Sequence, residues 1–159
     1  MSPRYEYDPS KATASIEIFP KGDYEFSVGE PKAFIRTNQN NEVSYGVRFA
    51  LTITSDQQRG KRTVQTCYLH NDGGQSMTKQ FQMAVYGFKR TSQDEQKFNE
   101  AMKDADWAFD PEVGTVGEAW HKMAGAHVVC TLDVGVNKDT HEQQQRFNNW
   151  RPAVTVAAT

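Results

Sequence analysis

Residues 61–71 alternate between two sets of positions, and one cationic and two aromatic side chains fall in the same set. One set of alternating positions holds the residues that could bind a polyanion with flat rings: Arg62, Tyr68 and His70. The other set holds Cys67 and Leu69, which we expect to face the core. Guanidinium groups bind phosphates and aromatic rings stack on bases, so the first set suits a single-stranded nucleic acid. The opposite phase, with Val64 and Tyr68 in the core, is the alternative.

Further candidates flank this segment. Arg48 stands on the polar side of the preceding alternating segment, and two polar loops carry more cations. Phe34 has two interpretations, because such a ring packs in a core about as readily as it stacks on a base. The full set of candidate nucleic-acid-binding residues is Phe34, Arg36, Arg48, Arg59, Lys61, Arg62, Tyr68, His70, Lys138, Arg146 and Phe147.

No constellation of catalytic or metal-ligating residues is visible in the sequence. The four histidines show no HxxxH or HExxH spacing. Cys67 and His70 are three positions apart, but neighbouring strand positions point to opposite faces. Residues 59–63 lack the first glycine of a GxxxxGK[ST] phosphate loop. We therefore expect a protein that is not an enzyme and that uses no cofactor and no metal.

The composition indicates one folded domain with an uneven charge distribution. The chain has 159 residues, 37% of them hydrophobic, and a formal net charge of −2, which excludes a histone-like polycation. Residues 36–90 carry eight basic groups against three acidic ones, whereas residues 91–118 carry eight acidic groups against Lys97 and Lys103. One part of the fold should therefore be locally basic and another locally acidic.

The sequence predicts neither a membrane span nor a secretory signal. Mean hydropathy is −0.75, no apolar run approaches about 20 residues, and residues 1–8 contain no apolar stretch. The two cysteines are 63 positions apart and form no disulfide framework, so we expect a reducing, cytoplasmic compartment.

Alternation predicts strands at both ends of the chain. Residues 1–21 read as an N-terminal arm or edge strand. A long strand follows from residue 22, and Gly29 and Pro31 within it indicate a bulge or sharp bend. Residues 43–53 alternate most strongly, and residues 61–71 complete an antiparallel meander. Two more strands lie near 128–134 and 144–152, before a short tail at 154–159.

Helical spacing predicts three helices in an insert covering residues 75–124. Ser76 is the expected N-cap of the first, and Ser92 and Thr115 open capping-box matches for the other two. The order β-β-β-α(α,α)-β-β predicts a mainly β fold, a single five-stranded OB-fold barrel over residues 22–153. A small α+β sandwich and a split barrel of another topology are the alternatives.

The sequence resembles the small OB-fold single-stranded DNA-binding proteins of bacteriophages. Four segments, spread over about residues 19–153, carry the resemblance: 19–28 (FPKGDYEFSV), 44–49 (SYGVRF), 125–130 (GAHVVC) and 149–152 (NWRP). Many such proteins end in an acidic tail that recruits replication partners, whereas residues 153–159 contain no acid.

The resemblance implies a sequence-independent single-stranded DNA-binding protein that acts in phage DNA replication or recombination, in the host cytoplasm. Single-stranded DNA is then the main partner, with replication or recombination proteins and a second copy of the chain as further candidates. One alternative is a phage protein-interaction module that binds a host or replication enzyme through the acidic insert, with Trp107 and Phe109 as its contact surface. A small-ligand or nucleotide-processing enzyme is the third.

Overall fold

The computed structural model describes residues 18–55 and 58–153. Most of the predicted N-terminal arm and the tail at 154–159 lie outside these residues. The strands are β1 (Gly22–Thr37), β2 (Val43–Ile53), β3 (Arg62–Tyr68), β4 (Phe109–Asp110), β5 (Thr115–Val116), β6 (His127–Val136) and β7 (Gln143–Pro152). The helices are α1 (Asp72–Val85), α2 (Ser92–Ala101) and α3 (Glu118–His121).

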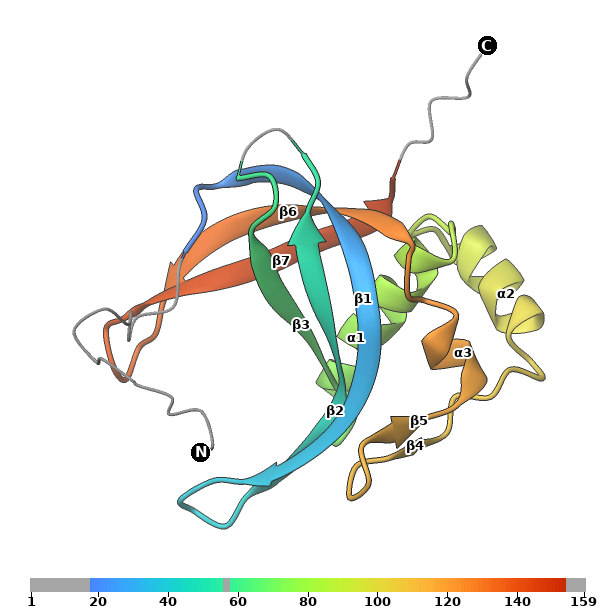
Figure 1. Ribbon diagram of the computed structural model, residues 1–159, viewed down its shortest axis with the longest axis horizontal. Coiled ribbons are helices and arrows are strands. Elements are labelled where there is room, and N and C mark those ends of the chain that lie inside the picture. The colour runs from blue at the N-terminus through green and yellow to red at the C-terminus, as the bar shows by residue number, and fades with distance from the viewer. Residues whose placement is uncertain (1–17, 56–57, 154–159) are drawn as a thin grey trace, which may run out of the picture.

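Five strands form one antiparallel sheet in the order β3-β2-β1-β6-β7, and the helices lie between β3 and β6 in the sequence. The fold is therefore mixed but mainly β. Figure 1 shows β1 as a long curved strand that runs through the whole sheet. Its first residues, Gly22–Ser27, pair with β6, and Phe26–Thr37 pair with β2 on the other side. In the described part of the chain no pairing joins β3 to β7, so the predicted barrel does not close between these strands.

The bend predicted in the first strand is present. The register between β1 and β2 shifts between Val28 and Pro31. At Gly29 the backbones come close, because an added Cβ would lie 2.9 Å from the carbonyl oxygen of Ala50. A glycine is needed here for the two strands to cross at this distance.

The helical insert differs in its boundaries from the prediction. Asn71, not Ser76, caps α1 by accepting a hydrogen bond from the Gly74 N–H at 2.7 Å. The sequence pattern missed this start because Gly73 and Gly74 are poor helix formers. Thr91 caps α2 one position before the predicted residue.

Thr115 does not begin a helix. It lies in β5, which pairs with β4 in a small hairpin that periodicity did not reveal, because each strand has only two residues. The following helix α3 begins at Glu118, after Gly117.

Aromatic rings fill the core between the curved sheet and α1. Phe81 of α1 lies 4.8 Å from Trp150 of β7 and 5.4 Å from Phe49 of β2, measured between ring centroids. Trp120 is buried, as the sequence suggested. Within the described ranges, no helix is both long and apolar enough to span a bilayer.

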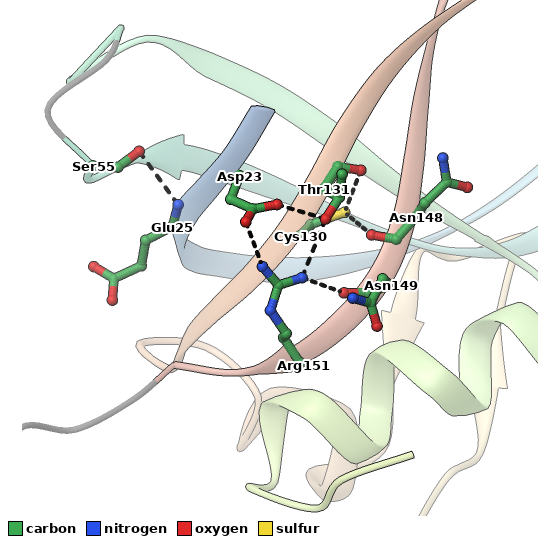
Figure 2. Close-up of polar contacts among 8 residues, drawn as sticks. All are labelled: Asp23, Glu25, Ser55, Cys130, Thr131, Asn148, Asn149 and Arg151. Carbon is green, nitrogen blue, oxygen red and sulfur yellow. Dashed lines mark hydrogen bonds and ion pairs between the residues drawn. The ribbon is translucent and has the colours of Figure 1, made fainter. Parts of the chain in front are cut away.

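A bulge in β7 turns Trp150 into this core. The register between β6 and β7 shifts where Asn149, with φ at 56°, adds an extra residue to β7. The residue after Trp150, Arg151, points away from the core and reaches across β6 to β1 (Figure 2). Its Nη2 lies 3.1 Å from Asp23 Oδ2, and the Thr131 hydroxyl donates to Asp23 Oδ1 at 2.6 Å.

These contacts favour the ionised form of the Asp23 carboxyl. The Thr131 hydroxyl and then the Arg151 guanidinium lower the pKa of the Asp23 carboxyl below its ordinary value. A carboxylate with a lowered pKa stabilises the fold above that ordinary value and loses its contribution as the pH falls through the folded-state pKa.

We therefore expect Asp23→Asn to lower the melting temperature slightly near neutral pH, and this difference from the wild type to shrink progressively as the pH falls below about 3.8, the ordinary pKa of an aspartate. Melting curves across this range test the expectation, with Asp139→Asn in the β6–β7 loop as the control. An equal difference between wild type and Asp23→Asn at every pH would contradict it.

Candidate nucleic-acid interface

Four side chains from three strands form a row on the outer face of β1, β2 and β3. We call Arg48, Phe34, Tyr68 and Arg36 the cation–aromatic row. Phe34 and Tyr68 lie opposite the same residue of β2, Gly46, one on each side. Arg36 is two positions from Phe34 on β1, and Arg48 is two positions from Gly46 on β2. Strand alternation therefore places both arginines on this face.

Cations and rings alternate along the row. The Arg48 guanidinium carbon lies 6.0 Å from the Phe34 ring centroid, and Phe34 meets Tyr68 edge to face at 5.9 Å. Arg36 lies 5.9 Å from the Tyr68 centroid, and its Nη2 donates to the Tyr68 hydroxyl at 2.7 Å. These contacts hold both guanidinium groups against the two rings.

Gly46 makes this arrangement possible. A Cβ at this position would overlap the carbonyl oxygen of Cys67 on β3. The two strands therefore pair only with a glycine here, and the rings of Phe34 and Tyr68 meet above it.

We expect Gly46→Ala to destabilise the fold by roughly 2–3 kcal/mol, because the clash involves backbone and cannot be relieved by a rotamer change. Denaturant unfolding measures the effect. Ser44→Ala, two residues earlier on the same face, is the control and should change stability little. Equal stability of the two variants would show that β2 and β3 accommodate the methyl group.

The burial of β3 matches the phase preferred from the sequence. Cys67 is 1% exposed and Gln65 is 8% exposed, and both face the core side. Arg62 and Val64 are exposed, and Tyr68 is half-buried on the outer face.

The remaining cations of the β2–β3 region lie at the far end of the same face. Arg62 pairs with Thr52, six residues from Tyr68 along β3, which corresponds to roughly 20 Å. Arg59 and Lys61 are exposed in the turn that precedes Arg62. The face therefore carries cations at both ends and the rings at one of them, with Ala50 and the exposed Val64 between.

The candidates of the last two strands are dispersed. Lys138 is exposed in the β6–β7 loop, which extends from the left of the sheet in Figure 1. Arg146 lies on the outer face of β7, against Gly135 of β6. Phe147 packs on the core side, stacked on Trp150 at 5.7 Å and 6° between ring planes, so it is not an open stacking surface.

His70 is not in the open part of the face. Its ring is half-buried between Tyr68, at 5.6 Å, and Tyr45, at 5.9 Å. It therefore supports the Tyr68 ring from the side and lines the groove next to it.

Sequence reasoning missed Lys32, which is exposed on the same face and opposite Arg48. The signal was present, since Lys32, Phe34 and Arg36 follow one another at spacing two. The sharp bend at residues 29–31 concealed it by interrupting the alternation.

The two aromatic residues of the acidic insert pack against the fold. Trp107 meets Trp120 edge to face at 4.9 Å, and Phe109 stacks on Tyr45 at 6.0 Å. Both are half-buried and belong to the margin of the core. They offer less free surface to a protein partner than the sequence suggested.

The thiols and carboxylates of the described residues form no reactive cluster. Burial raises the pKa of Cys67 to about 12, which keeps this thiol protonated and unreactive. Within residues 18–55 and 58–153, no three histidine, cysteine or acidic side chains gather where they could hold a metal ion.

No protein-family model matches this chain, and no curated protein matches it significantly.

Proposed function

We propose that the chain is a sequence-tolerant single-stranded DNA-binding protein of the OB-fold type, which acts in bacteriophage DNA replication or recombination. The cation–aromatic row is the observation that carries the proposal. It combines the two kinds of group that bind single strands, guanidinium for phosphates and aromatic rings for bases, on adjacent strands.

The strand order supports the OB-fold part of the proposal. In that fold the first strand is shared between both halves of the barrel and the helix follows the third strand, as β1 and α1 do here. OB-folds bind oligonucleotides on the face of their second and third strands. The row and the cations toward Arg62 lie on that face.

Binding would be physical, with no chemical step. Arg36, Arg48, Arg62 and Lys32 attract phosphates and release counterions, so the affinity should fall steeply as salt rises. Phe34 and Tyr68 stack on bases, and stacking tolerates base changes because every base has a π-face.

A titration with labelled oligo-dT at two salt concentrations, with a duplex of the same length in parallel, tests the proposal. We expect tight, salt-dependent binding of the single strand and weaker binding of the duplex. Equal affinity for both, or no binding at low salt, would refute it.

A further inference from the structure

The part of β1 that carries Phe34 and Arg36 lies at an edge of the main sheet. Pairing of β1 with β6 ends at Ser27, whereas pairing with β2 continues to Thr37. From residue 29 onward, the side of β1 that faces away from β2 therefore has no partner strand of the main sheet. Such an edge is held by a strand from one side only, so the positions of its side chains depend on what else packs against it.

The β4–β5 hairpin of the acidic insert lies against this edge (Figure 1). The Ala33 N–H, next to Phe34, donates to the carbonyl oxygen of Gly114 at 3.3 Å. In the described part of the chain, this is the one backbone hydrogen bond that β1 makes away from β2 beyond Val28. Gly114 lies in the turn between β4 and β5 with φ at 91°, and a Cβ there would be 3.4 Å from Lys32 Cε. The hairpin therefore takes the place of a partner strand next to Phe34.

A chain of aromatic rings links the same hairpin to Tyr68. Phe109 of β4 stacks on Tyr45 of β2, with 6.0 Å between the ring centroids and 28° between the ring planes. Tyr45 meets His70 at 5.9 Å, and His70 meets Tyr68 at 5.6 Å, both edge to face. All four rings are half-buried, so each one limits how far the next can turn.

The hairpin thus reaches both rings of the cation–aromatic row, Phe34 through the backbone of β1 and Tyr68 through the chain of rings. The hairpin itself is a poor surface for DNA. Its carboxylates Asp110 and Glu112 are exposed and repel phosphates. Any favourable effect of the hairpin on affinity should therefore pass through Phe34 and Tyr68.

We propose that the β4–β5 hairpin is a positioning element for the cation–aromatic row, with Phe109, Tyr45 and His70 as its positioning residues. The inference rests on the proposed function and gives the acidic insert a part in it. Rings that are already held in place lose less conformational freedom when bases stack on them. The hairpin therefore increases the affinity for a single strand without touching it.

Oligo-dT titrations of Phe109→Ala test the proposal. We expect this variant to bind about three- to tenfold more weakly than the wild type, because the freed rings must be ordered on binding. The slope of log affinity against log salt should stay unchanged, since no phosphate contact is lost. Phe88→Ala is the matched control and should leave the affinity unchanged. Phe88 is also a half-buried ring of the insert, but it packs on Phe98 of α2, at 5.6 Å.

A double-mutant cycle shows whether the effect passes through the two rings of the row. The background variant Phe34→Ala/Tyr68→Ala lacks both rings and is titrated at low salt, where the arginines still attract the strand. In this background, Phe109→Ala should change the affinity by less than about twofold. His70→Ala should weaken binding only when the two rings are present. His70→Phe keeps a ring between Tyr45 and Tyr68 and should bind as the wild type does.

The outcomes separate the positioning role from the proposed function. If Phe109→Ala bound as tightly as the wild type, or if its loss persisted in the background without the two rings, the positioning role would be overturned and the proposed function would stand. If Phe109→Ala does not fold, His70→Ala decides in its place by the same two criteria. Failure of the wild type to bind any oligonucleotide would instead overturn the proposed function.

Discussion

The double variant Arg48→Glu/Arg62→Glu should bind single-stranded DNA at least about twentyfold more weakly than the wild type near 0.1 M salt. Both residues are exposed on the outer face of β2 and β3. Each phosphate contact on a single strand contributes about 0.7 to the slope of log affinity against log salt. Loss of two contacts should therefore reduce the magnitude of that slope by about 1.4, and the added carboxylates repel the strand further.

The expected effect depends on position and not on net charge. Lys97→Glu/Lys103→Glu changes the formal charge of the protein by the same amount, within the exposed part of the acidic insert. We expect this control to weaken binding far less, because its charges are not on the outer face of β1–β3. Oligo-dT titrations at several salt concentrations compare the two variants. An equal loss in both would show that long-range charge, and not the face, governs affinity.

The sheet was predictable where alternation is uninterrupted. Val47, Phe49 and Leu51 of β2 alternate without a break and are all fully buried. The bend of β1 was predictable for a different reason, since Gly29 and Pro31 are residues that a regular strand avoids. Strand phase and bend position both depend on residues that are neighbours in the sequence, so the sequence alone predicts them.

Features that depend on distant contacts were not predictable. The strands β4 and β5 are too short to show an alternating pattern in the sequence. Their hairpin packs near β1, where the Ala33 N–H donates to the Gly114 carbonyl at 3.3 Å. Whether β3 pairs with β7 is set by the twist of the whole sheet and by α1 at its end. Local pattern carries no information about either.

The candidate site was predictable in part for the same reason. Alternation placed Arg48, Arg62 and Tyr68 on one face correctly. It could not show that His70 turns toward Tyr45 after β3 ends, because Tyr45 lies on another strand. It also could not show that Phe147 stacks on Trp150, because the bulge at Asn149 interrupts the alternation between them.

Tyr68→Ala should weaken single-strand binding by about 1–3 kcal/mol, which is roughly 5- to 150-fold, because a base loses its stacking partner. The structure adds a second loss, since the Tyr68 hydroxyl also holds the Arg36 guanidinium. Tyr68→Phe keeps the ring and removes only that hydrogen bond. We therefore expect Tyr68→Phe to bind nearly as tightly as the wild type at low salt.

Stability measurements separate this role from a packing role. Tyr68 is half-buried and meets Phe34 and His70 edge to face, so its removal should cost some stability but much less than that of a fully buried ring. Phe49, which is completely buried on β2, provides the comparison, and Phe49→Ala should cost about 3–5 kcal/mol of folding free energy. Melting curves and oligo-dT titrations on the same preparations test both effects. If Tyr68→Ala melted as early as Phe49→Ala but bound normally per folded molecule, Tyr68 would be a packing residue and the cation–aromatic row would not be the binding surface.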